Sequence, residues 1–225
     1  MPPFPPPHFP GEAFINSDLI SSLIIVVASF FIYFWTKELY QLSGHKGIKY
    51  FRYAFLFFGL SFLMQFARPI LEWFTELSRS EIRTTVTFLI VYTGSMAVLC
   101  LLYSVLWKKL KKYANHDFLV VNVCAVVLAS STMLGRYHFL ILLLQMMLFI
   151  LAIVLGYVDS KKKKSRVIEL YLLYLLLFCS WLANIVAKFV VHLSFSMGVL
   201  LNIVSALLFL VLMYKVVKRT RVKQK

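Results

Sequence analysis

The chain has 225 residues, of which 61% are hydrophobic and only 15% carry a charge. A soluble domain has about 45–50% apolar residues and about a quarter charged ones, so this composition excludes a soluble globular protein and indicates a polytopic membrane protein. The formal net charge of +15 would suggest nucleic acid as the partner of a soluble chain. Here the cations are bunched between long apolar runs, and we expect no nucleic-acid partner.

The sequence predicts three regions. Residues 1–17 form a tail with six prolines among its first ten residues, a composition that favours an extended conformation. This tail has no positively charged n-region and is not expected to be a cleavable signal peptide. Residues 18–214 form a transmembrane domain, and residues 215–225 a basic tail that is too short to fold.

Seven apolar runs are long enough to cross about 30 Å of hydrocarbon as helices. The polar residues 16–18 are placed to cap the first run, and Gly44 and Gly47 allow a tight turn before the second. Proline disfavours helix at the residue before it, so the second run should end near Pro69, and residues 70–83 should form a separate surface helix. The runs lie at about 18–36, 48–68, 84–107, 118–134, 138–158, 167–190 and 194–214.

The lysine-rich loop at residues 159–166 sets the predicted orientation. Basic clusters in short loops stay in the cytoplasm, and counting outward from this loop puts the N-terminus outside and the C-terminus inside. Nineteen of the 24 Lys and Arg residues then lie on the cytoplasmic side. The predicted fold class is an all-α membrane protein, a seven-transmembrane helix bundle in a prokaryotic cell membrane.

The cations of the inner side form a basic cytoplasmic face. We expect this face to bind the anionic lipid of the inner leaflet or an acidic cytoplasmic signalling protein. It consists of Lys46, Lys49, Lys108, Lys109, Lys111, Lys112, Lys161, Lys162, Lys163, Lys164 and Arg166.

The second and sixth runs resemble each other. An offset of 119 residues pairs Ser61 with Ser180 and Gln65 with Asn184. Runs one to three and five to seven also share their orientation, as a three-plus-one-plus-three parallel repeat requires. The alternative is a chance match between apolar segments.

Polar side chains recur at helical spacing on single faces of the second, sixth and seventh runs. Polar groups in hydrocarbon usually face the bundle interior or a wet cavity. One interpretation is a cavity that opens outward and has a cationic rim, which suits a small anionic ligand. The other is hydrogen bonding between helices, worth about 0.6 kcal/mol per bond. The residues concerned are Ser61, Gln65, Arg68, Ser180, Asn184, Lys188 and Asn202.

The sequence lacks the residues that several kinds of membrane-protein chemistry require. No Asp or Glu lies near the middle of an apolar run, which disfavours proton pumping through buried acids. The three cysteines lie inside apolar runs without CxxC spacing, and there is no HExxH. The last run has no lysine that could hold retinal. We therefore expect no catalytic residue, no metal and no cofactor.

Three neighbouring pieces carry a resemblance to a known family. These are Tyr33–Tyr40 (YFWTKELY), the turn His45-Lys46-Gly47 and the aromatic Tyr50–Leu60 (YFRYAFLFFGL). Over about 30 residues they resemble the start of the seven-helix sensor modules of prokaryotic signalling proteins. In those modules a short basic loop joins span one to an aromatic-rich span two. The resemblance implies signal reception, and without a kinase or cyclase domain it implies a separate partner.

The function expected from the sequence is that of a non-enzymatic, receptor-like membrane protein that signals or binds through its basic cytoplasmic face. The alternative is a facilitative transporter of a small polar or anionic solute through the polar cavity. An intramembrane enzyme is the third hypothesis.

Overall fold

The residues that the computed structural model describes form seven α-helices and no strand. The described residues are 12–74, 78–110, 117–133, 138–162, 168–191 and 193–222. This confirms the all-α prediction. The helices are α1 (Glu12–Ser43), α2 (Lys46–Phe74), α3 (Arg79–Leu110), α4 (Asp117–Met133), α5 (His138–Lys162), α6 (Ile168–Val190) and α7 (Phe195–Val222).

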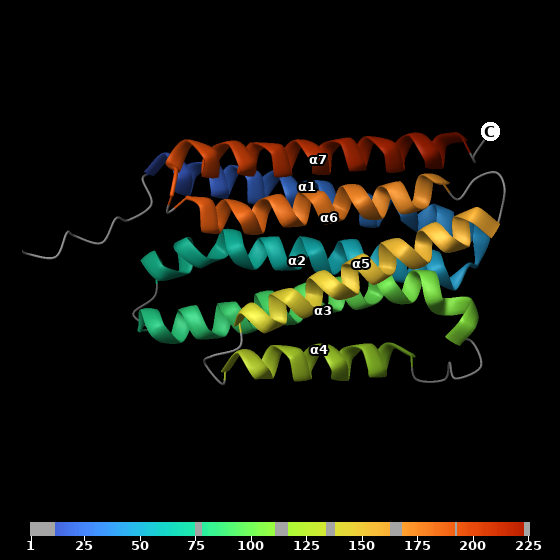
Figure 1. The fold of residues 1–225 in the computed structure, drawn as a ribbon, viewed down its shortest axis with the longest axis horizontal. Coiled ribbons are helices and arrows are strands. Elements are labelled where there is room, and N and C mark those ends of the chain that lie inside the picture. The colour runs from blue at the N-terminus through green and yellow to red at the C-terminus, as the bar shows by residue number, and fades with distance from the viewer. Residues whose placement is uncertain are drawn as a thin grey trace, which may run out of the picture.

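Six of the helices close into a ring, and the seventh stands outside it (Figure 1). Helix α2 packs between α1 and α3, α7 packs on α1, α6 packs on α7, and α5 bridges α6 and α3. Helix α4 lies against α3 and barely touches α5. The helices alternate in direction, so one end of the bundle carries the start of α1, and we call it the N-terminal end. The opposite end carries the start of α2 and is called the basic end.

Length and surface composition both indicate a membrane bundle. Six of the described helices are long and apolar enough to cross a membrane. Helix α4 has 17 residues, which at 1.5 Å per residue is only about 25 Å. Large apolar side chains are exposed around the outside of the bundle, above all on α4, α5 and α7. Lipid tails, rather than water, are the solvent that suits such a surface.

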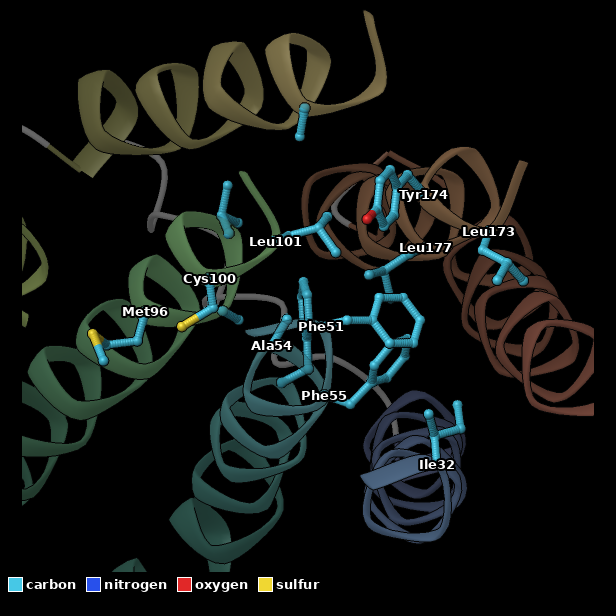
Figure 2. Close-up of a cluster of buried hydrophobic side chains, with 14 of the residues drawn as sticks. Ile32, Phe51, Ala54, Phe55, Met96, Cys100, Leu101, Leu173, Tyr174 and Leu177 are labelled. Carbon is cyan, nitrogen blue, oxygen red and sulfur yellow. The ribbon is translucent and has the colours of Figure 1, made fainter. Parts of the chain in front are cut away.

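Aromatic side chains fill the middle of the ring. Phe51 and Phe55 project from α2 and meet Tyr174 and Leu177 of α6 between the helices (Figure 2). The rings of Phe51 and Tyr174 lie 6.2 Å apart. All four side chains are almost inaccessible, and Phe149 of α5 extends the cluster toward α6. The centre of the bundle is therefore closed by packed rings.

Two predicted helix boundaries are wrong because the helices are longer than the apolar runs. Helix α1 begins at Glu12, so residues 16–18 lie inside the helix and do not cap it. Helix α7 continues to Val222, so most of the tail at 215–225 is helical. Adding a residue to an existing helix costs little, and lysine and arginine are good helix formers.

The separate surface helix predicted at residues 70–83 is also wrong. Helix α2 runs through Pro69 to Phe74 without a break, and α3 begins at Arg79. A proline inside a helix removes the hydrogen bond to the carbonyl four residues earlier, which here belongs to Gln65. Neighbouring helices allow membrane helices to tolerate this loss.

The turn between α1 and α2 is placed as predicted, and its two glycines have different roles. Gly44 has a φ of +60°, a conformation that costs other residues strain, and its N–H donates to the carbonyl of Tyr40 at 2.9 Å. Gly47 lies within α2. A Cβ atom there would stand 2.9 Å from the backbone oxygen of Ser104 and 2.9 Å from Cδ1 of Trp107. Gly47 therefore allows the close approach of α2 and α3.

Candidate functional site

Two of the seven predicted cavity residues, both serines, donate hydrogen bonds to the backbone of a neighbouring helix. Ser61 on α2 donates a hydrogen bond to the backbone carbonyl of Ile90 on α3, at 3.3 Å. Ser180 on α6 donates to the carbonyl of Ser205 on α7 at 2.8 Å, and Ser205 donates back to the carbonyl of Ser180 at 2.8 Å. Both predicted residues are buried. At these two positions the interpretation as hydrogen bonds between helices fits the structure.

Gln65 and Lys188 meet across the bundle near its N-terminal end. The Nζ atom of Lys188 on α6 donates to Oε1 of Gln65 on α2, at 2.6 Å. Helices α2 and α6 are separated by α1 and α7 on one side of the ring and by α3 and α5 on the other. This bond, between an exposed lysine and a half-buried glutamine, therefore spans the ring near its N-terminal end.

Arg68, the second cation predicted at the rim of the cavity, forms an ion pair within its own helix. Nε of Arg68 lies 3.1 Å from Oε1 of Glu72, one turn further along α2. Arg68 and the Asp18 carboxylate of α1 both lie within electrostatic range of the Lys188 ammonium. Two acids thus accompany the two cations, and the cluster is close to neutral.

Asn184 and Asn202 occupy the same level of the bundle. The serine pair fixes the antiparallel register of α6 and α7, and one turn toward the N-terminal end brings each helix to its asparagine. Asn184 is 3% exposed and Asn202 is 0% exposed. Nδ2 of Asn202 donates to Oγ of Ser17 on α1, at 3.3 Å. Nδ2 of Asn184 and Oδ1 of Asn202 are buried and have no hydrogen-bond partner.

Helix α1 adds an acid at this level. Ser17 pairs with Asn202 and Trp35 with Thr220, each at a separation of 185 residues, so α1 and α7 run parallel in a fixed register. Asp18 follows Ser17 and lies within one turn of the two asparagines. Its Oδ1 atom is buried without a partner, and so is Oγ of Ser22, one turn deeper.

These residues together define a polar cluster, made of Asp18, Ser22, Gln65, Asn184, Lys188 and Asn202. Buried polar atoms almost always have a hydrogen-bond partner, and four atoms of this cluster have none among the described residues. The cluster presents both kinds of group. Asn184 offers a donor, and Asn202 and Asp18 offer acceptors.

Two other intramembrane amides join helices. Nε2 of Gln145 on α5 donates to Oγ of Ser95 on α3 at 2.9 Å, and Nδ2 of Asn122 on α4 donates to the hydroxyl of Tyr92 on α3 at 3.1 Å. Among the described residues no group of three His, Cys, Asp or Glu side chains could hold a metal ion.

The helix ends place the predicted basic face at one end of the bundle. Lys46 is exposed and Lys49 is half-buried at the start of α2. The backbones of Lys108 and Lys109 end α3, and those of Lys161 and Lys162 end α5, at this same end. The remaining members of the face, Lys111, Lys112, Lys163, Lys164 and Arg166, lie outside the described residues.

Sequence reasoning missed the contribution of α1 to the polar cluster. Asp18 was interpreted as part of a helix cap, and Ser22 and Ser205 were passed over. A signal was present, since Asp18, Ser22 and Ser29 recur at intervals of four and seven residues and therefore share one face of α1. That face points inward, because Ser22 is 1% and Ser29 0% exposed.

The comparisons with known proteins identify a relative without an assigned activity. No protein-family model matches the chain, and no solved structure matches it. An uncharacterized protein of Archaeoglobus fulgidus is 34% identical to the chain over 198 residues, which cover 84% of this chain and 86% of that protein. Identity at this level over nearly the full length of both chains shows common descent. This multi-pass helical membrane protein therefore belongs to the same family as the uncharacterized protein of Archaeoglobus fulgidus.

Proposed function

We propose that this protein is a non-enzymatic receptor of the membrane, which binds a small uncharged or zwitterionic molecule in the polar cluster at its N-terminal end. The observation that carries the proposal is one buried donor, Nδ2 of Asn184, and one buried acceptor, Oδ1 of Asn202, neither of which has a hydrogen-bond partner among the described residues. A ligand with one acceptor and one donor satisfies both amides. The ammonium of Lys188 and the carboxylate of Asp18 complement a zwitterion.

The closed centre of the ring supports a receptor over a carrier. Phe51, Phe55, Tyr174 and Leu177 fill the space below the polar cluster. A solute bound at the cluster meets packed rings instead of further polar groups. Interiors of this density have a few discrete arrangements instead of deforming continuously, so binding at one end can shift helices at the other.

The partner in this proposal is a cytoplasmic signalling protein that contacts the basic end. The resemblance of Tyr33–Tyr40 and Tyr50–Leu60 to sensor modules supports this role, because those modules pass a signal from the membrane to a cytoplasmic output. Lys46 lies in the turn that the resemblance includes, and Lys49 directly precedes its aromatic segment. An acidic surface on the partner complements them.

The orientation that goes with this function has the N-terminus outside and all seven helices crossing. Helix α4 is at the short limit for a span, since about 17 residues suffice when the bilayer adapts. Its apolar outer side, with Val123 and Val127 exposed, supports a crossing. The parallel repeat of α1–α3 and α5–α7 stays a prediction.

Facilitative transport of a small polar solute is the second candidate. The specific observation in its favour is the bond between Lys188 and Gln65, which joins α2 to α6 across the ring. A bond of this kind can act as a gate if the aromatic rings below also separate.

The test combines binding with flux. The purified protein is screened in detergent against amino acids, sugars and small carboxylates, with the melting temperature as the readout. We expect an uncharged or zwitterionic compound to raise it in the wild type and not in Asn184→Leu. Asn122→Leu is the matched control, because this asparagine joins α3 and α4 outside the cluster, and it should keep the response.

Proteoliposomes then separate the two candidates. A receptor that binds the radiolabelled compound gives no uptake above that of empty vesicles. Uptake that is lost in Asn184→Leu and kept in Asn122→Leu would show that the protein is a transporter and not a receptor. If no compound in the screen distinguishes the wild type from Asn184→Leu, the binding site itself is refuted.

A further inference from the structure

A buried arginine lies near the basic end of the bundle, between α1 and α2. Arg52 is only 8% exposed and no ion pair joins it to a carboxylate among the described residues, where Arg68 and Glu72 form the ion pair found. Arginine stays charged under all ordinary conditions. Charges are buried in proteins only when they are paired and hydrogen-bonded, so a buried guanidinium without an acid indicates a missing anion.

The protein holds this guanidinium in a fixed position. Nε of Arg52 donates to the backbone carbonyl of Tyr33 on α1, at 3.2 Å. The guanidinium carbon lies 4.8 Å from the centre of the Tyr33 ring and 5.8 Å from that of Tyr40. The two tyrosines are seven residues apart and share one face of α1. Together they form aromatic walls that restrict the rotation of the guanidinium.

Most of the hydrogen-bonding capacity of Arg52 remains available. A guanidinium has five N–H donors in a planar fork, and the protein uses the Nε donor. The Nη atoms are not among the buried atoms without a partner, so they reach the surface of the protein. A fork of this kind matches the oxygens of a phosphate, which it binds with two parallel hydrogen bonds.

The position of Arg52 along the bundle corresponds to the boundary between the hydrocarbon and the headgroups. Helix α2 has 29 residues and is about 44 Å long at 1.5 Å per residue, while the hydrocarbon core is about 30 Å thick. A centred α2 therefore extends about 7 Å beyond the hydrocarbon at each end. Arg52 is six residues, about 9 Å, from the start of α2, which puts its backbone at this boundary, where tyrosines concentrate.

We propose that Arg52, held between Tyr33 and Tyr40, is a binding site for the phosphate of an anionic phospholipid in the leaflet at the basic end. The acyl chains of this lipid lie against the apolar outside of α1, where Phe31 and Phe34 are exposed. Lys37, which is exposed on α1, and Lys49, which is half-buried three residues before Arg52 on α2, supply further positive charge at this end of the bundle. This site is separate from the polar cluster at the other end and does not depend on it.

Reconstitution in lipid nanodiscs tests the site. The melting temperature is measured in phosphatidylcholine alone and with increasing phosphatidylglycerol, which gives an apparent affinity for the anionic lipid. We expect phosphatidylglycerol to stabilise the wild type, and Arg52→Gln to weaken its apparent affinity about tenfold. Arg52→Lys keeps the positive charge but not the planar fork of donors, and it should reduce the apparent affinity for phosphatidylglycerol by less than Arg52→Gln does. Arg83→Gln removes an exposed arginine at the N-terminal end and should change the affinity less than twofold.

Each other outcome overturns the proposal. Equal stabilisation by both lipids in the wild type excludes an anionic-lipid site, and unchanged selectivity in Arg52→Gln places the site elsewhere. If Arg52→Gln does not fold, Arg52→Lys carries the test, and wild-type affinity in that variant is the refuting result. Stabilisation by millimolar inorganic phosphate in pure phosphatidylcholine, lost in Arg52→Lys, would assign the site to a soluble anion instead.

Discussion

Ser180 on α6 and Ser205 on α7 each donate a hydrogen bond to the backbone carbonyl of the other, and both bonds are 2.8 Å long. The two hydroxyl oxygens are themselves 3.2 Å apart, and both side chains are buried. Small residues let helices approach closely in a membrane, and here they also fix the register. That register places Asn184 and Asn202 at the same level of the bundle.

Removing either serine hydroxyl should weaken the contact between α6 and α7. Bonds of this kind are worth about 0.6 kcal/mol, so we expect Ser180→Ala and Ser205→Ala to cost about that much each. The free energy of unfolding in mixed detergent measures the effect. Ser131→Ala is the control, because its hydroxyl bonds only the Leu128 carbonyl within α4. An equal loss in the control would refute the interpretation.

Gly47 should not tolerate a methyl group. The Cβ atom of an alanine would stand 2.9 Å from the backbone oxygen of Ser104, which a side-chain rotation cannot relieve. Overpacking of this kind costs about 1–3 kcal/mol. At Gly94 the nearest atoms lie 3.7 Å away, and Gly94→Ala should be neutral or stabilise the helix by about 0.5–1 kcal/mol. Similar melting temperatures for the two variants would contradict this packing.

Tyr174 should stabilise the contact between α3 and α6 through its hydroxyl. The hydroxyl hydrogen of Ser104 is donated to the Leu101 carbonyl at 2.6 Å, so Tyr174 is the donor in its 2.8 Å bond to Ser104. Tyr174→Phe removes a buried bond and should cost about 1 kcal/mol of unfolding free energy. Tyr214→Phe, at an exposed position on α7, should cost almost nothing. Equal effects of the two substitutions would show that the bond contributes nothing.

Single cysteines test the orientation. After the three natural cysteines are replaced, Lys162→Cys should react with a membrane-impermeant maleimide only in opened cells, because its end of α5 is expected in the cytoplasm. Arg83→Cys, at the start of α3, should react in intact cells. Labelling of residue 162 from outside would show that the topology is the reverse of the one proposed. Arg52 would then lie in the outer leaflet.

The positions of the helices followed from hydropathy, and their ends did not. Each apolar run predicted from the sequence corresponds to one helix, because a polar backbone in lipid must form its hydrogen bonds within the same segment. The helices continue past the hydrocarbon, as α1 and α7 do, since extension of an existing helix needs no apolar residue. Pro69 misled the prediction because a local preference was outweighed by the packing of α2 on α1 and α3.

The sequence by itself determined which side chains are polar within the apolar runs and which faces they share. Only the tertiary structure decided what each of them contacts, because the register between helices depends on packing between segments far apart in the chain. Ser61 and Ser180 thus join helices, Gln65 accepts a hydrogen bond from Lys188, and Nδ2 of Asn184 and Oδ1 of Asn202 remain buried without partners. Arg52 counted in the sequence only as one charge of a basic loop, and its place between two tyrosines of α1 followed from the contact of α1 with α2.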